Sequence, residues 1–397
     1  MGRIFQLNRR ELFLFICLGI LSYYFYQRTD CFQLSGQSLT NLQFINNDTF
    51  RSALRTYPKA WPPLYPSILY ILIHIGISSE VINFLFFGLV LAFIIALFKN
   101  YLKNIPWIYP ALLYGVSAFN FYNMRQYVSE TMFIALSFSV FFSLLGYMKK
   151  PGLKHLAILI VASALSCLTR YFALFWILPV AIFVIVKVNH PDLKKVCRHA
   201  AGFLFFSLIP IAIWMFSAYQ QTGYFSGMDR FGLRYLPGGQ FCAYGSTHLG
   251  TNIFLITKTI FIDFFSIDKI ADHSTVMRHY PLKIIELFIG LLVFYIFIRN
   301  IYSLIKKWRV KADTIYLIPV FALAYLFAIM LVWGISNNDP LYSRFLYPFY
   351  PYIIISIFIY YSFFIKGNPG LQGLLFKMLY CCYIAVNLYK GFMLCAH

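Results

Sequence analysis

Long apolar runs, separated by short polar connectors, dominate the chain. Many of these runs approach the roughly 20 residues that a helix needs to cross the hydrocarbon core of a bilayer. The pattern therefore predicts an all-α polytopic membrane protein. The apolar runs are 12–27, 64–78, 81–98, 106–122, 130–148, 155–169, 172–186, 202–218, 284–304, 315–335, 345–365 and 374–393.

One of these runs, 64–78, is not predicted to cross the membrane. It is short, opens with Pro62-Pro63 and contains His74. If it crossed, every later connector rich in Lys and Arg would lie on the side opposite to the basic N-terminus, against the positive-inside rule. We therefore expect this segment to lie on the outer face, which leaves about 11 spans, the first of them an uncleaved N-terminal helix.

The charge of the chain can be divided between the two sides of this topology. The 33 Lys and Arg residues outnumber the 13 Asp and Glu residues, giving a formal charge of +20, and with 60% hydrophobic residues an ordinary soluble globule is excluded. The inner side receives 19 basic and three acidic residues, and the outer side 14 basic and ten acidic residues. Most of the excess positive charge is thus membrane anchoring and indicates no nucleic-acid partner, whereas the outer face is the better candidate for chemistry.

The predicted organisation is a single membrane domain over residues 1–397, with no separate soluble domain. Two outer segments, 27–80 and 219–283, are long enough to form structure of their own. Cys31 and Cys242 lie in these segments and either form a disulfide or are two unrelated small apolar residues.

Charged residues gather at the predicted outer boundary. Arginine suits phosphate because its guanidinium is always charged and offers a planar fork of donors, and a neighbouring carboxylate can act as a general base. The alternative is that these residues are interfacial anchors or ion pairs, and that Glu130 is simply an acid at a helix N-terminus. The residues are Asp30, Asp48, Arg51, Arg125, Glu130, Arg170, Arg230, Arg234, Asp339 and Arg344.

Several short motifs occur in a characteristic order after the first span and its acidic outer segment. They are Trp61-Pro62-Pro63-Leu64-Tyr65-Pro66, Ser129-Glu130, Leu168-Thr169-Arg170, Tyr219-Gln220-Gln221-Thr222-Gly223 and Ser343-Arg344-Phe345-Leu346-Tyr347-Pro348. In this order and topology, over about residues 10 to 365, the chain resembles the GT-C superfamily of polytopic glycosyltransferases. The pattern is most similar to the bacterial branch that resembles protein mannosyltransferases and aminoarabinose transferases.

The resemblance implies an inverting transferase that moves a sugar from a polyprenyl-phosphate donor to a lipid, glycan or protein acceptor at the outer face of a bacterial inner membrane. By spacing, Asp30 matches the family's essential acid best. The position four residues later is Leu34 where the family has an aromatic residue, so Asp48 remains a competing base.

The remaining site residues are assigned from the same resemblance and from the chemistry of the side chains. We expect Arg170 and Arg344 to bind the donor phosphate with support from Arg125 or Arg230. Glu130, Tyr65 and Asp339 are expected in the pocket, with the Tyr65 ring available to stack on a sugar.

No cofactor is predicted to be obligatory. The first outer segment has no adjacent pair of acids, and the outer histidines are scattered along the chain. Dependence on a divalent metal remains an open alternative. Three other functions remain as alternatives: a polysaccharide polymerase, a flippase or transporter of lipid-linked glycans, and a non-catalytic scaffold with the same fold.

Overall fold

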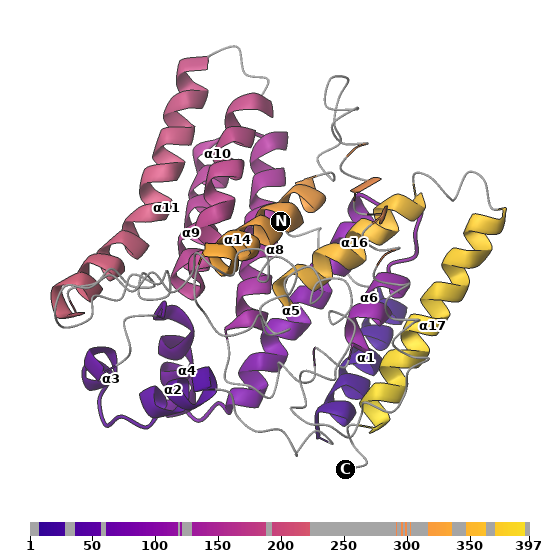
Figure 1. The fold of residues 1–397 in the computed structure, drawn as a ribbon, viewed down its shortest axis with the longest axis horizontal. Coiled ribbons are helices and arrows are strands. Elements are labelled where there is room, and N and C mark those ends of the chain that lie inside the picture. The colour runs from indigo at the N-terminus through magenta and orange to yellow at the C-terminus, as the bar shows by residue number, and fades with distance from the viewer. Residues whose placement is uncertain are drawn as a thin grey trace.

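The fold is helical in the part of the chain that the computed structural model describes (Figure 1). Described are residues 8–27, 36–56, 61–117, 120, 129–187, 193–222, 291, 295–296, 298–299, 302, 317–335, 347–362 and 370–393. None of them forms a strand, which confirms the predicted all-α class for these ranges. The elements are α1 (Arg9–Gln27), α2 (Gly36–Ile45), α3 (Phe50–Thr56), α4 (Leu64–His74), α5 (Ser79–Asn100), α6 (Ile108–Gly115), α8 (Glu130–Lys149), α9 (Leu153–Thr169), the 3₁₀ turn η1 (Tyr171–Ala173), α10 (Leu174–Lys187), α11 (Leu193–Thr222), α14 (Leu317–Ile335), the 3₁₀ turn η6 (Tyr347–Phe349), α16 (Tyr350–Tyr360) and α17 (Leu371–Met393).

The longer helices pack into a bundle, and three short ones lie at one end of it. Helices α8, α9, α10 and α11 lie side by side, with α5 packed on α8 and α6 on α5 (Figure 1). Helix α14 contacts both α10 and α16, so that the C-terminal half returns to the N-terminal half. The short helices α2, α3 and α4 form a unit below the ends of α5 and α9, which we call the α2–α4 cap.

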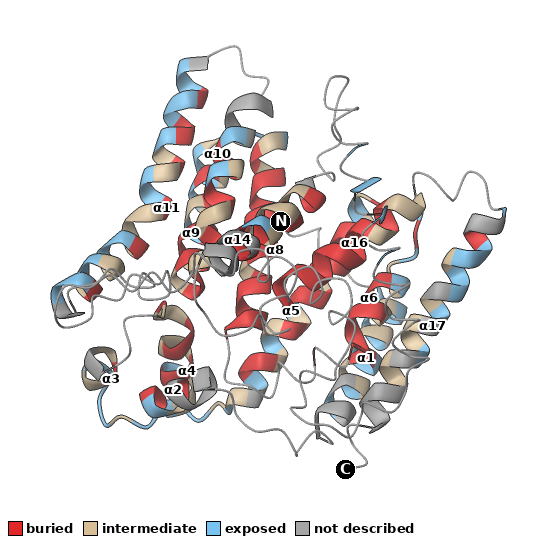
Figure 2. Cartoon of the chain, viewed as in Figure 1, coloured by how far each residue is buried: buried red, intermediate tan, exposed pale blue. Residues whose placement is uncertain are grey.

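The surface of the bundle is unusually apolar. Buried residues are concentrated on α5, α8 and α16 (Figure 2). Many large apolar side chains are nevertheless exposed. Leu85, Phe205 and Ile213 are each more than 60% exposed. Because soluble monomers rarely expose large contiguous apolar areas, this surface agrees with a protein that is surrounded by lipid.

Three described helices are long and apolar enough to cross a membrane. They are Val81–Asn100, Glu130–Lys149 and Lys194–Gln220, and six further apolar helices have 10 to 17 residues within the described ranges. The predicted number of about 11 spans therefore stays a prediction. Helix α4 has 11 residues, a length of about 16 Å, which is too short to cross the roughly 30 Å core and agrees with the expectation for run 64–78.

The predicted span 106–122 differs from the structure. Helix α6 ends at Gly115, and Val116 and Ser117 are not helical. The Tyr114 carbonyl near this end accepts hydrogen bonds from the Ser117 backbone amide at 3.3 Å and from the Asn120 side chain. The apolar composition of the run continues beyond the residue at which the helix ends.

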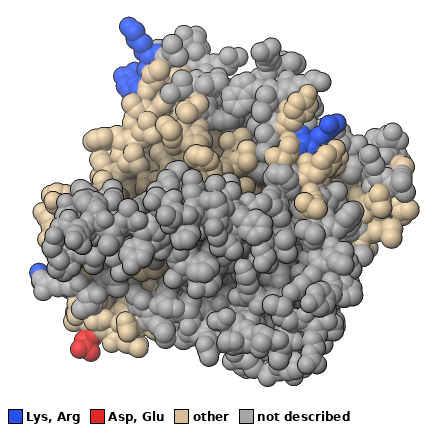
Figure 3. Space-filling model, in the orientation of Figure 1, with Lys and Arg blue, Asp and Glu red and all other residues tan. Residues whose placement is uncertain are grey.

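The two ends of the bundle differ in charge. One end of the bundle lies opposite to the α2–α4 cap and contains the C-termini of α5 and α8 and the N-termini of α9 and α11. At this end the Tyr147 hydroxyl of α8 hydrogen bonds His199 of α11 at 2.7 Å. Exposed basic residues collect at this end, namely Lys149, Lys150, Lys154, Lys194, Lys195 and Arg198. In Figure 3 the visible basic side chains lie mainly in the upper half of the view, and a basic side chain also shows at the left edge, above the visible acidic side chain at the lower left.

The first prediction concerns this polarity. Arg51 lies in α3 of the α2–α4 cap and Lys150 follows α8 at the opposite end, and both are exposed. In a variant whose eight cysteines are replaced by serine, we expect Arg51→Cys to react with a membrane-impermeant maleimide in intact cells and Lys150→Cys to react only after permeabilisation. Reaction of both positions from the same side would contradict the predicted topology.

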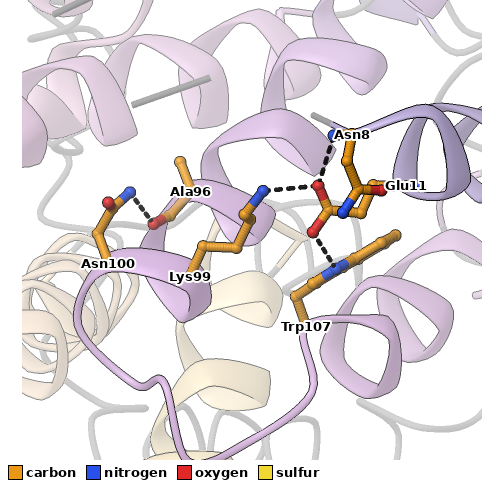
Figure 4. A network of polar contacts seen from close by, with 6 residues as sticks. All are labelled: Asn8, Glu11, Ala96, Lys99, Asn100 and Trp107. Atoms are coloured by element: carbon orange, nitrogen blue, oxygen red, sulfur yellow. Dashed lines mark hydrogen bonds and ion pairs between the residues drawn. The ribbon is translucent and has the colours of Figure 1, made fainter. Parts of the chain in front are cut away.

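Helix α1 is fixed to the bundle at the basic end by a polar network around Glu11 (Figure 4). The Glu11 carboxylate accepts hydrogen bonds from Lys99 Nζ of α5 at 2.6 Å and from Trp107 Nε1 at 3.2 Å. Asn8 and Glu11 also cap each other's backbone amides at 2.8 and 2.9 Å, the reciprocal arrangement of a capping box. Burial raises the pKa of Glu11, but the hydrogen bonds from Lys99, Asn8 and Trp107 and the Lys99 charge outweigh it and hold the pKa below its ordinary value of 4.5.

The second prediction follows from the lowered pKa of Glu11. A carboxyl whose folded pKa is depressed stabilises the fold above its unfolded pKa, and this contribution is lost as the pH falls through the folded value. We expect Glu11→Gln to lower the free energy of unfolding by about 1 kcal/mol at pH 7, since the ion pair is partly exposed. Denaturant titrations in detergent should show the difference from wild type shrinking below pH 4.5; a difference that does not depend on pH would contradict the assignment.

Candidate functional site

A buried ion pair joins α8 to the break between α9 and η1. Arg170 Nη1 lies 2.7 Å from Glu130 Oε1, and the side chains are 5% and 0% exposed. Glu130 is the first residue of α8, and Arg170 has extended backbone angles (φ −151°, ψ 134°) directly after α9. Because α9 ends at Thr169, the direction of the Arg170 side chain is not set by the helical geometry of α9. The side chain instead extends to Glu130 of α8.

Aromatic rings enclose the pair. The guanidinium carbon of Arg170 lies 5.8 Å from the centre of the Phe172 ring and 6.0 Å from that of Phe133. Trp176 stacks on Phe133 with the ring centres 4.9 Å apart and the planes 7° apart. In such an apolar setting the attraction between the two charges is strong, and losing either partner is costly.

Polar groups of three further elements lie around the pair. The Ser129 hydroxyl accepts a long hydrogen bond of 3.5 Å from Arg170 Nη1. The Tyr347 hydroxyl in η6 hydrogen bonds the Tyr114 hydroxyl of α6 at 3.2 Å, and both rings are completely buried. Tyr325 of α14 packs against Phe133 and interacts electrostatically with both members of the pair. Residues from the first and last thirds of the chain thus converge on the start of α8.

One carboxylate oxygen of Glu130 has no hydrogen-bond donor among the described residues. Glu130 Oε2 is buried and accepts no hydrogen bond from any residue that the structure describes. A buried carboxylate oxygen without a donor is costly, since nothing replaces the water that it loses on folding.

The pair lies at the end of the bundle that the α2–α4 cap covers. Met132, two residues after Glu130, belongs to one apolar cluster with Ile45 of α2, Tyr65 and Leu69 of α4, and Ile82 of α5. This contact brings the predicted outer segment 27–80 to the same end as Glu130 and Arg170.

The structure places four of the predicted site residues. Glu130 and Arg170 are brought together as an ion pair, one of the alternatives that the sequence leaves open. Tyr65 is 1% exposed and its hydroxyl donates to Asn83 Oδ1 at 3.1 Å, so its ring holds α4 against α5 rather than presenting a free face. Asp48 is exposed in the turn between α2 and α3. The predicted residues Asp30, Arg125, Arg230, Asp339 and Arg344 lie outside the described residues.

Several residues of the site had no role in the sequence-based assignment. Tyr114, Phe133, Trp176 and Tyr325 are ordinary aromatic residues of apolar runs, in a chain with 31 Tyr and 44 Phe. Tyr347 is the exception, because it lies within one of the motifs that carry the family resemblance. The other four have no local signal that separates them from core residues.

The described residues bring no three His, Cys, Asp or Glu side chains together in a group that could hold a metal ion. Asp30, a member of the first outer segment, lies outside them. No protein-family model matches the chain, and a search of curated proteins finds no match.

Proposed function

We propose that this chain is a membrane glycosyltransferase. It takes a sugar from a polyprenyl-phosphate donor and transfers it, with inversion, to a lipid, glycan or protein acceptor at the outer face of a bacterial inner membrane. The proposal joins the resemblance to the GT-C superfamily with the arrangement of charged and aromatic residues at the capped end of the bundle.

The observation that carries the proposal is the buried Glu130–Arg170 pair. Replacing a buried ion pair by apolar residues is often neutral or stabilising, so stability alone is a weak reason for one. Ionisable residues inside apolar helical bundles commonly mark sites of function. Here the pair lies under the α2–α4 cap, beside the segment that carries a candidate base.

The chemistry requires a base for the acceptor and positive charge for the leaving group. The carboxylate of Asp30 or Asp48 takes the proton of the acceptor hydroxyl while its oxygen attacks the anomeric carbon. The bond from that carbon to the phosphate oxygen breaks, and its electron pair leaves with the polyprenyl phosphate. A phosphate is a stable anion and needs no general acid, unlike the leaving group of a glycoside hydrolase.

Arginine supplies the positive charge at the phosphate in this proposal. Arg170 lies in the buried pair with Glu130, and Arg344, Arg125 and Arg230 are assigned from the sequence. Developing negative charge is stabilised most where water is excluded and the donors are already in place. The aromatic enclosure by Phe133, Phe172 and Trp176 provides such a setting around Arg170.

The test is a transfer assay with the full chain in lipid nanodiscs. Short-chain polyprenyl phosphates that carry glucose, galactose or mannose are offered with a membrane extract as the source of acceptor, and released polyprenyl phosphate is measured. Release that depends on both protein and acceptor is the expected result. Movement of intact lipid-linked sugar across liposomes, with no release, would instead favour the flippase alternative.

A further inference from the structure

The two carboxylate oxygens of Glu130 differ in their surroundings. Glu130 Oε1 contacts Arg170, whereas Oε2 is buried and accepts no hydrogen bond from the described residues. A carboxylate has about four acceptor positions, and the described residues leave most of the acceptor capacity of Glu130 unfilled. The fold thus holds a desolvated acceptor in place.

Arg170 holds this acceptor in position. The guanidinium lies 2.7 Å from Oε1, and the rings of Phe133 and Phe172 restrict where it can go. As the carboxylate partner of a guanidinium, Glu130 presents an oxygen that accepts hydrogen bonds.

We propose that Glu130 Oε2 accepts a hydrogen bond from a hydroxyl group of the transferred sugar and thereby determines which sugar the site selects. This inference rests on the proposed function and adds the ligand group that Glu130 recognises. A buried acceptor rejects a ligand that lacks the matching donor, because the acceptor is then left unpaired. A guanidinium and a carboxylate 2.7 Å apart also match a sugar phosphate, in which an anion and hydroxyl groups lie close together.

The position of Glu130 agrees with this role. It is the first residue of α8, at the end of the bundle beneath the α2–α4 cap, and the neighbouring Met132 contacts the cap. A lipid-linked sugar whose phosphate lies at the membrane surface therefore meets Glu130 at the end of the helix and not in the middle of a span. In this inference Arg170 is a positioning residue for Glu130 as well as part of the phosphate site.

The experiment compares the binding of sugar-bearing and sugar-free lipids to the full chain in nanodiscs. The probes are short-chain polyprenyl phosphates that carry glucose, galactose or mannose, and the same lipid phosphate without a sugar. We expect wild type to bind one sugar-bearing lipid about tenfold more tightly than the sugar-free lipid, and Glu130→Gln to lose this preference. Analogues of the preferred sugar that lack one hydroxyl should show which hydroxyl Glu130 accepts, since wild type alone should discriminate against that analogue.

A double variant distinguishes loss of the acceptor from destabilisation by an unpaired buried charge. Glu130→Gln leaves Arg170 buried without its counter-charge, so Glu130→Gln/Arg170→Gln is tested in parallel as a variant with no buried charge. Both variants should lose the preference for sugar. Equal preference in wild type and in both variants, or no preference in wild type, would overturn the inference.

Failure of the inference and failure of the proposed function have different signatures. If wild type releases polyprenyl phosphate but Glu130→Gln keeps the sugar preference, the transferase proposal stands and the role of Glu130 is wrong. If the sugar preference depends on Glu130 but no polyprenyl phosphate is ever released, the binding role stands and the transferase proposal is wrong.

Discussion

Replacing Arg170 by methionine is expected to lower the free energy of unfolding by about 3–5 kcal/mol, because it leaves the Glu130 carboxylate buried without a counter-charge. Glu130 is 0% exposed, so water cannot replace the lost partner without opening the aromatic enclosure. Methionine is unbranched, flexible and apolar, so it can fill part of the space of the arginine side chain without a charge. The measurement is a denaturant titration of the purified protein in detergent.

Two further variants make this result interpretable. Lys99→Met breaks the other ion pair, in which the side chains are 28% and 14% exposed, and should cost about 1 kcal/mol or less. Glu130→Leu/Arg170→Met removes both buried charges and should recover most or all of the stability. If Arg170→Met costs no more than Lys99→Met, the buried pair does not carry the desolvation cost described above.

The second large effect is expected at the acids of the first outer segment. Replacing the true base by its amide, either Asp30→Asn or Asp48→Asn, should lower the rate of sugar transfer by about 10²–10⁴-fold, because an amide cannot take the proton of the acceptor hydroxyl. The readout is released polyprenyl phosphate in nanodiscs. Asp48 is exposed in the α2–α3 turn, so Asp48→Asn should leave the unfolding curve unchanged and separate chemistry from folding.

The pair of variants also decides between the two acids. The turn that carries Asp48 follows Ile45, which packs in the same cluster as Met132 near Glu130, and this contact brings Asp48's segment to the site. Spacing along the chain instead favours Asp30. Loss of transfer in only one variant identifies the base, whereas full activity in both would reject the general-base mechanism for this segment.

The sequence alone was sufficient for the class of fold and for most helix positions. The runs 130–148 and 155–169 became α8 and α9 within two residues at each boundary, and 315–335 became α14. This follows because a helix in an apolar setting satisfies its own backbone hydrogen bonds, so a local run of apolar residues is enough to specify it. Two boundaries differ: α6 ends at Gly115, inside the run 106–122, and α11 begins at Leu193, before the run 202–218. Apolar composition alone does not determine where these two helices end and begin.

The candidate site depended on tertiary structure. Glu130 and Arg170 were each singled out by being charged at the end of an apolar run, yet their pairing depends on a helix break at Thr169 and on how α9 packs against α8. The contact between Tyr114 and Tyr347 joins residues 233 positions apart, and no local pattern predicts it. Apolar runs in the sequence determine that helices form. Packing determines which of the few polar groups meet between the helices. The physical reason is that only the packed bundle buries a charge, which makes the charge costly, and places a partner beside it.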